Sequence, residues 1–218
     1  YRTEFTYGYN INYANFSSYL MHGDFDHVTH SMDFPQSLNT SKWGVHDEYV
    51  FDKFFDELEH STGPFFKIMM TQSSHEPYDV PMKTAIPGED DIHRFMNSAF
   101  YTDSCFGVFI DRAKRTTWWE NTLIVVTADH GHIYPGNQGL TNPDRFKIPM
   151  LWLGGALSVR DTVIQTIAGH PDIPNTILGQ LGMYEKEFVF SRDILSRSYN
   201  PWAVYVFNNG FGVVKPGD

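Results

Sequence analysis

The segment 122–132 constrains the fold of this chain more than any other stretch. A run of β-branched and apolar residues, 122–128, leads directly into Asp129, His130 and Gly131. A continuous run of this kind is typical of a strand that is buried on both faces, as in a parallel sheet covered by helices. Ligands of such sheets bind beyond the carboxyl ends of the strands. The sequence therefore predicts a site at Asp129 and His130, where Gly131 allows a sharp turn.

The chemistry of this pair favours a divalent cation. A carboxylate oxygen from Asp129 and an imidazole nitrogen from His130 are ligands that Zn²⁺ and Mn²⁺ accept. A structural alternative stays open, in which Asp129 caps the following turn and His130 is a packed surface residue. His75 follows another apolar run, 65–71. Because parallel strands end at one edge of a sheet, we expect His75 to face the same crevice, although by itself it could equally bond to a loop backbone.

Strand-like segments alternate with amphipathic segments along the chain. Strands are predicted at 2–8, 25–32, 65–71, 122–128 and 146–153, and helices at 12–21, 47–60, 91–113 and 172–181, with a loop at 33–42. Asp47 is expected to cap its helix. Pro149 is expected to mark either the start of the regular ladder or an edge position, and a hairpin over 202–214 is expected to turn at Asn209-Gly210. The alternation predicts an α/β fold, with a mostly parallel central sheet and helices on both faces.

Composition excludes several classes of function. The net charge of −10 over 218 residues, without a basic stripe, argues against a nucleic-acid surface. The single cysteine, Cys105, excludes an internal disulfide and is expected to be a structural thiol. No run of 18 apolar residues occurs, so the 218 residues themselves are expected to be soluble. We expect one domain over 1–218, in which the segment from about 185 to 218 is peripheral.

Six segments in a shared order resemble one enzyme group. Three of them, 73–78, 128–131 and 146–155, are similar to the sulfatase-like branch of the alkaline phosphatase superfamily. Within that branch the chain is most similar to the lipoteichoic acid synthase and phosphoglycerol transferase group. The match extends through three further segments, Trp43-Gly-Val-His-Asp-Glu48, Asn97–Asp103 and Asp172–Leu178.

The resemblance implies a metal-dependent phosphoryl-ester transferase or hydrolase. Its members use a divalent metal, foremost manganese, with Zn, Mg or Ca as alternatives, beside a threonine nucleophile. Asp129 and His130 match two of the family's metal ligands, and His75 matches a substrate-binding histidine. The implied substrate is a lipid- or glycan-linked phospho- or sulfo-ester. The implied parent protein is anchored in the cell membrane, with its catalytic domain in the periplasm or outside the cell.

The chain also departs from the family pattern. The family places its nucleophile and another acidic ligand near the beginning of the catalytic domain, and no Thr or Ser lies in a matching context. We therefore expect the C-terminal portion of a catalytic domain, incomplete at the N-terminus and inactive by itself. Cys105 lacks the x-Pro-x-Arg sequence that follows a formylglycine nucleophile. Two alternatives remain open: a sulfuric ester hydrolase that acts on sulfated glycans, and a non-catalytic domain that binds an anionic polymer.

Overall fold

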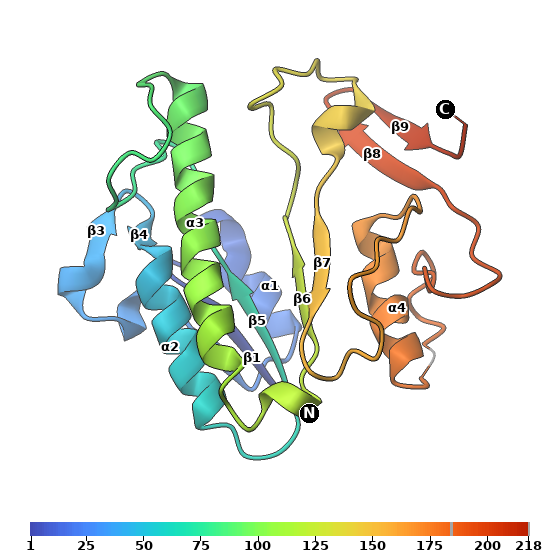
Figure 1. The fold of residues 1–218 in the computed structure, drawn as a ribbon, viewed down its shortest axis with the longest axis horizontal. Coiled ribbons are helices and arrows are strands. Elements are labelled where there is room, and N and C mark those ends of the chain that lie inside the picture. The colour runs from blue at the N-terminus through green and yellow to red at the C-terminus, as the bar shows by residue number, and fades with distance from the viewer. Residues whose placement is uncertain (184, 218) are drawn as a thin grey trace. The chain divides into compact units, whose positions relative to one another are not determined.

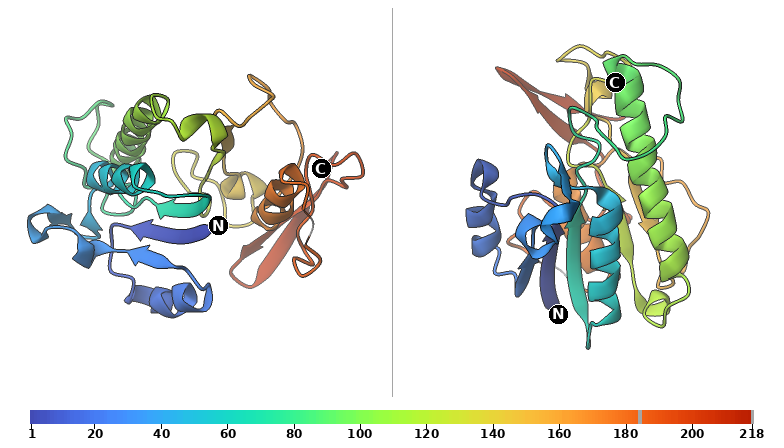
Figure 2. Two further views of the ribbon diagram at one scale, coloured as in Figure 1. Left: turned by 90° about the horizontal axis from the view of Figure 1, so that it is seen from below. Right: turned by 90° about the vertical axis from the view of Figure 1, so that its left-hand side faces the viewer.

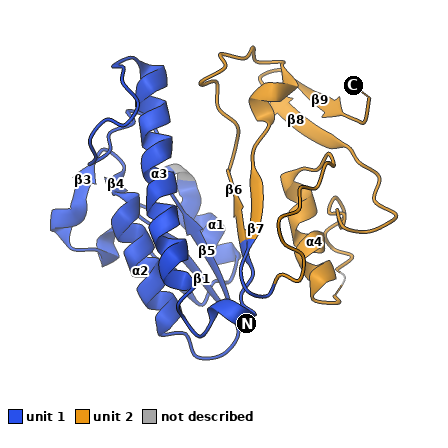
Figure 3. Ribbon diagram, viewed as in Figure 1, with its two compact units in different colours: residues 1–124, 153–156 blue, residues 125–152, 157–218 orange. Residues whose placement is uncertain are grey.

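The computed structural model describes residues 1–183 and 185–217 and divides into two compact units. Unit 1 consists of Tyr1–Ile124 and Leu153–Ala156, and unit 2 of Val125–Trp152 and Leu157–Asp218 (Figure 3). Among the described residues, none of the helices combines the length and the apolar character needed to cross a membrane. The expectation of a single domain over 1–218 stays a prediction.

A three-stranded parallel sheet forms the centre of unit 1. Its order is β2-β1-β5, with β1 at Arg2–Tyr7, β2 at His27–Thr29 and β5 at Phe65–Met70 (Figure 1). Both neighbours run parallel to β1. Three predicted strands and their parallel pairing are thereby confirmed.

Helices cover both faces of this sheet, as predicted (Figure 2). Successive side chains of a strand point to opposite faces. Phe5 of β1 contacts the ring of Phe16, with 5.6 Å between ring centroids, and Phe16 begins α1 (Phe16–His22), which follows a short 3-10 turn at Tyr13–Asn15. On the other face, the hydroxyl of Thr6 donates to Glu57 over 2.8 Å, and Glu57 belongs to α2 (Asp47–Glu59).

The main apolar core of unit 1 lies between α2 and α3 (Asp91–Ala113). Its buried members are Phe51, Leu58, Phe109 and Ile110. These residues lie on the apolar faces of the amphipathic segments 47–60 and 91–113, from which both helices were predicted. Cys105 packs against this core, and burial raises the pKa of its thiol to about 11, as expected of a structural thiol.

A small hairpin occupies part of the segment that we predicted as a loop. After two 3-10 turns, Ser31–Asp33 and Gln36–Leu38, β3 (Asn39–Ser41) pairs antiparallel with β4 (Gly44–Val45). Gly44 has φ +110°, and a Cβ atom there would lie 2.4 Å from the carbonyl oxygen of Gly8. The prediction was wrong for β3 because a strand of three residues is too short to show a period of two.

The strand before Asp129 forms, but it is not buried. β6 (Ile124–Thr127) pairs with β7 (Met150–Leu153) in a separate two-stranded sheet. Its residues are half-buried or exposed, which corrects the expectation of burial on both faces, because in the described residues this sheet has only two strands. β7 begins directly after Pro149, as expected, and the 3-10 turns Trp119–Asn121 and Pro143–Phe146 precede the two strands.

Unit 2 is organised around a buried ion pair. Asp172, which is 1% exposed, ends a 3-10 turn (His170–Asp172) that leads into α4 (Ile173–Gln180). Arg192 donates to both oxygens of its carboxylate, over 2.8 and 2.7 Å. The hydroxyl of Tyr199 donates to the same carboxylate over 3.1 Å. Two residues of the segment 185–218, which we predicted to be peripheral, are therefore bonded to the start of α4.

The C-terminal hairpin has the predicted position but a different turn. β8 (Ala203–Phe207) pairs antiparallel with β9 (Gly210–Val214), and Phe207 faces Gly210 at the end of the ladder. The turn is therefore Asn208-Asn209, one residue earlier than the predicted Asn209-Gly210. Asn209 takes the left-handed conformation with φ +69°, which Asn tolerates better than other residues with a side chain.

Candidate functional site

The loop that carries His75 is fixed by a buried carboxylate. Asp47 is fully buried and accepts the backbone N–H groups of Gln72, over 2.9 Å, and Ser73, over 3.2 Å. Its second oxygen accepts the hydroxyl of Thr102 on α3 over 2.6 Å. We expected Asp47 to cap α2, but the N-cap is His46. The backbone of the loop after β5 provides better partners for this carboxylate.

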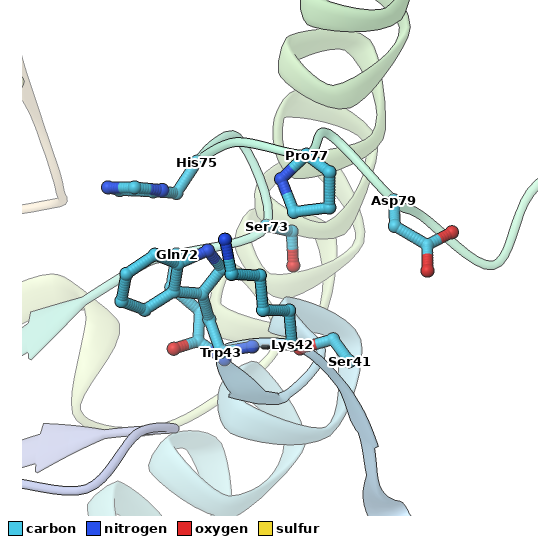
Figure 4. A pocket seen from close by; sticks show the side chains of 8 residues that line it. All are labelled: Ser41, Lys42, Trp43, Gln72, Ser73, His75, Pro77 and Asp79. Carbon is cyan, nitrogen blue, oxygen red and sulfur yellow. Dashed lines mark hydrogen bonds between the residues drawn. The ribbon is translucent and has the colours of Figure 1, made fainter.

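His75 lies exposed at the rim of a small pocket in unit 1 (Figure 4). Its ring contacts the indole of Trp43, with 4.2 Å between ring centroids. The pocket is formed by the β3–β4 hairpin and the loop after β5, through Ser41, Lys42, Trp43, Gln72, Ser73, His75, Pro77 and Asp79. Sequence analysis singled out His75 but missed Trp43 and Lys42, although Trp43 opens one of the six segments that carried the resemblance.

The polar groups of this pocket suit a small anionic group that also carries a hydroxyl. Lys42 brings an ammonium group, whose Nζ lies 5.3 Å from the centroid of the Trp43 ring. Gln72 donates from Nε2 to the carbonyl of Val45 over 2.7 Å, while its buried Oε1 has no hydrogen-bond partner among the described residues. Asp79 contributes an opposing negative charge. A protonated histidine and a lysine together bind anionic oxygens.

Asp129 and His130 lie together directly after β6, in unit 2. Asp129 Oδ2 is 3.5 Å from His130 Nε2. A cation with ligand bonds of about 2.0–2.2 Å can join two atoms at such a separation. His130 Nδ1 lies 2.8 Å from the carbonyl oxygen of Gly131. Since a carbonyl only accepts hydrogen bonds, this contact places the hydrogen on Nδ1 and leaves the lone pair of Nε2 for a metal.

The pair fits a metal ion as two ligands of a larger set. Both side chains are exposed, Asp129 at 61% and His130 at 72%. Among the described residues, no group of three or more His, Cys, Asp or Glu side chains could hold a metal ion. His132 uses its Nδ1 to accept the backbone N–H of Tyr134 over 3.0 Å. The structure therefore brings Asp129 and His130 together, whereas His75 belongs to the other unit.

Two backbone contacts fix the turn that carries the pair. His170 Nε2 lies 2.7 Å from the carbonyl oxygen of Ala128, the residue before Asp129. A Cβ atom at Gly131 would lie 2.0 Å from the carbonyl oxygen of Arg145, so this close approach requires glycine. In the sequence, His170 lies directly before Pro171 and Asp172, near the start of a predicted helix. Nothing in its local sequence signals a contact with a residue 42 positions away.

Comparison with known proteins gives the family. The sulfatase family model matches residues 1–183. The chain belongs to the sulfatase family. This sulfatase-family chain is similar to a protein of the alkaline phosphatase superfamily from Vibrio parahaemolyticus, with a TM-score of 0.85 and 28% identity over 99% of the chain and 53% of that structure. The predicted superfamily and fold class are thereby confirmed.

Curated relatives of this sulfatase-family chain come from the predicted group. It is 24% identical to the lipoteichoic acid synthase-like YvgJ of Bacillus subtilis, over 79% of the chain and 31% of that protein. It is 28% identical to phosphoglycerol transferase I of Escherichia coli, over 60% of the chain and 18% of that protein. The lipoteichoic acid synthase LtaP of Listeria monocytogenes shares the fold, with a TM-score of 0.82 and 22% identity over 93% of the chain and 55% of that structure. The chain thus spans less than a third of these curated relatives and about half of the solved structures.

Proposed function

We propose that this chain is part of a metal-dependent enzyme that transfers or hydrolyses a phosphoryl ester, in the manner of a phosphoglycerol transferase. The observation that carries the proposal is the Asp129–His130 pair, whose Oδ2 and Nε2 atoms lie 3.5 Å apart at the end of β6. The pair lies inside the segment that the sulfatase model matches. Relatives named as a lipoteichoic acid synthase-like protein and a phosphoglycerol transferase support the choice of ester.

Asp129 and His130 would hold a divalent ion, foremost Mn²⁺, with Zn²⁺, Mg²⁺ or Ca²⁺ as alternatives. When bound, this ion would neutralise negative charge on the ester oxygens. Further ligands would come from water, substrate oxygens or parts of a longer protein. His75 and Lys42 would bind anionic oxygens of the substrate, and a protonated His75 would donate a hydrogen bond to them. Gln72 Oε1 would accept a hydrogen bond from a substrate hydroxyl.

The remaining parts of the proposal concern the whole protein. We propose that a threonine outside these residues is the nucleophile and that the chain alone does not turn over substrate. The substrate would be a lipid- or glycan-linked ester. The parent protein would be anchored in a membrane, with its catalytic domain outside the cytoplasm.

Titration calorimetry with Mn²⁺ on the full-length parent protein tests the metal site. We expect Asp129→Ala to weaken Mn²⁺ binding by about 100-fold or more, because removal of a direct ligand costs at least as much as the loss of its outer partners. The control is Asp103→Ala, which removes an exposed carboxylate from α3. Equal Mn²⁺ affinity in the parent protein and in Asp129→Ala would refute the metal site.

Two other functions are alternatives to this proposal, and the first has a specific observation in its favour. The family model is named for sulfatases, so hydrolysis of sulfuric esters on glycans is the second candidate. Release of p-nitrophenol from p-nitrophenyl sulfate, rather than from the phosphate diester analogue, would favour it in the full-length protein. Turnover of neither, together with retained binding of an anionic polymer, would favour a non-catalytic binding domain.

A further inference from the structure

We propose that Trp43 is a positioning residue that fixes the imidazole of His75 as its Nδ1–H tautomer and leaves Nε2 available to the substrate. The inference rests on the proposed role of His75 as the residue that contacts the substrate's anionic group. It goes beyond that role because it assigns a separate residue, on a separate hairpin, to the orientation of the ring.

Trp43 reaches the loop of His75 through two contacts. The two rings lie 4.2 Å apart between centroids, at an interplanar angle of 53°. The indole Nε1–H of Trp43 donates to the carbonyl oxygen of Glu76, the residue after His75. Figure 4 shows the indole beside the imidazole at the edge of the pocket. One side chain of the β3–β4 hairpin therefore contacts both the ring of His75 and the backbone that follows it.

The carbonyl of Glu76 connects Trp43 with the protonation pattern of His75. His75 Nδ1 lies 3.1 Å from this carbonyl oxygen. A carbonyl oxygen has two lone pairs and no hydrogen, so it can accept from the indole and from Nδ1 at once, but only if Nδ1 carries a hydrogen. The contact therefore selects the Nδ1–H tautomer. Nε2 then has its lone pair free, or donates when the ring is protonated.

Trp43 is itself held by two tyrosine rings. Its ring contacts Tyr9, at 5.2 Å between centroids, and Tyr13, at 5.7 Å. Both contacts are edge-to-face, the arrangement that the charge distribution of aromatic rings favours. These contacts fix the indole before any substrate arrives, so the orientation it imposes on His75 is present in advance.

The first part of the loop, from Gln72 to His75, has backbone contacts that do not involve Trp43. Asp47 accepts the backbone N–H groups of Gln72 and Ser73, and the backbone N–H of His75 donates to the carbonyl of Gln72 over 2.9 Å. Removal of the indole should therefore release the imidazole without unfolding the loop. This separation of roles makes the inference testable.

Orientation matters because catalytic contacts are sensitive to geometry. Hydrogen bonds weaken steeply as the donor angle falls below about 120°, and a misplacement of about 1 Å can cost about 100-fold in rate. His75 is exposed, so its ring could rotate freely without a packing partner. Trp43 provides that partner.

Long-range ¹H–¹⁵N NMR of the histidine rings in the full 218-residue chain measures the tautomer directly. The His75 signal is assigned as the one lost in His75→Gln. We expect the Nδ1–H pattern in the unmodified chain, a mixture of tautomers in Trp43→Phe, and a larger Nε2–H fraction in Trp43→Ala. Phe retains the ring contact but lacks the Nε1–H donor, so the two variants separate the two contacts.

The matched control is Trp118→Phe. Trp118 also donates from Nε1, to Glu59 over 2.7 Å, so this variant loses an indole hydrogen bond in unit 1 without touching His75. Binding of inorganic phosphate is measured on the same samples. We expect about tenfold weaker binding in Trp43→Ala and unchanged tautomer and binding in Trp118→Phe.

The outcomes distinguish this inference from the proposed function. An unchanged Nδ1–H pattern in both Trp43 variants would overturn the positioning role, even if phosphate binding still depended on His75. A changed tautomer in the Trp43 variants, with equal phosphate binding by His75→Gln and the unmodified chain, would support the positioning contact and refute the role of His75 in anion binding.

Discussion

At the scale of single residues, Asp47 holds the start of the loop that carries His75. Its carboxylate accepts two backbone N–H groups of that loop and the hydroxyl of Thr102. Gln72 and Ser73 are buried, and Thr102 is half-buried. Buried donors that lose their acceptor cost about 1–3 kcal/mol each, so one side chain carries much of the stability of the site.

We predict that Asp47→Ala lowers the free energy of unfolding by about 3 kcal/mol, because it leaves the N–H groups of Gln72 and Ser73 without an acceptor. Urea denaturation followed by circular dichroism measures the change. Asp103→Ala, at an exposed position of α3, should stay within about 0.5 kcal/mol of the unmodified chain. If the free energy of unfolding of Asp47→Ala also fell by no more than about 0.5 kcal/mol, water would be replacing the carboxylate as the acceptor.

The sequence predicted some of these residues and not others, for a physical reason. Asp129 and His130 are adjacent in sequence and follow an apolar run, so their proximity needs no tertiary information. Trp43 and Lys42 join His75 only because a hairpin folds next to the loop after β5. Asp47 lies where a helix cap is expected, and only the folded chain shows that its partners are 25 and 26 positions away.

At the scale of elements, the β3–β4 hairpin positions Lys42 and Trp43. The hairpin approaches β1 closely, since the backbone N–H of Val45 donates to the carbonyl of Gly8 over 3.0 Å. Gly44 makes this approach possible, with φ +110° and no side chain. The pocket therefore depends on one glycine of a hairpin whose strands are too short to be predicted.

We predict that Gly44→Ala destabilises the chain by about 2–3 kcal/mol more than Gly63→Ala. Both glycines have positive φ, +110° and +92°, so both variants carry backbone strain. Of the two, only Gly44 would place its new Cβ against another atom, the Gly8 carbonyl oxygen at 2.4 Å. At Gly63 no atom of the described residues lies within 4 Å. The melting temperatures of the two variants are compared by thermal unfolding. Equal melting temperatures would show that the hairpin can shift away from Gly8 without loss of stability.

Periodicity predicted the larger elements well and their burial less well. The long helices α2 and α3 follow from their apolar stripes, and β5 follows from its mostly apolar run. The strand β1 follows from a strand-like stretch that ends at Gly8. β6 has the same kind of run but is half-buried. An apolar run predicts that a strand forms and cannot say how many neighbouring strands cover it, because that number depends on the rest of the sheet.

At the scale of the whole molecule, the sequence predicted the α/β class but not the division into two compact units. The division separates an aromatic core between α2 and α3 from a second group of contacts around Asp172 and Arg192. The contacts of Asp172 join segments 20 and 27 residues apart, beyond the range of local patterns. Each unit therefore has a structural centre of its own.

We predict that Asp172→Ala raises amide hydrogen exchange throughout α4 and the segment 185–217, by 10-fold or more, while α2 and α3 keep their protection. The variant leaves the guanidinium of Arg192 without its buried partner, and loss of such a partner costs about 3–5 kcal/mol. Hydrogen exchange followed by mass spectrometry measures both units in one sample. Loss of protection in α2 and α3 to the same extent would show that the two units unfold as one.

The parallel pairing of β1 with β5 has a consequence for biosynthesis. β1 is the middle strand of its sheet, and its partner β5 comes much later in the sequence. Arg2 pairs with Phe65, and Tyr7 pairs with Met70. A ribosome that adds about 5–20 residues per second needs about 3–13 s to supply the 63 residues between the ends of this ladder. During that interval the aromatic strand Arg2–Tyr7 has emerged without its main partner, so the nascent chain would depend on a chaperone, or on early pairing with β2, to shield it.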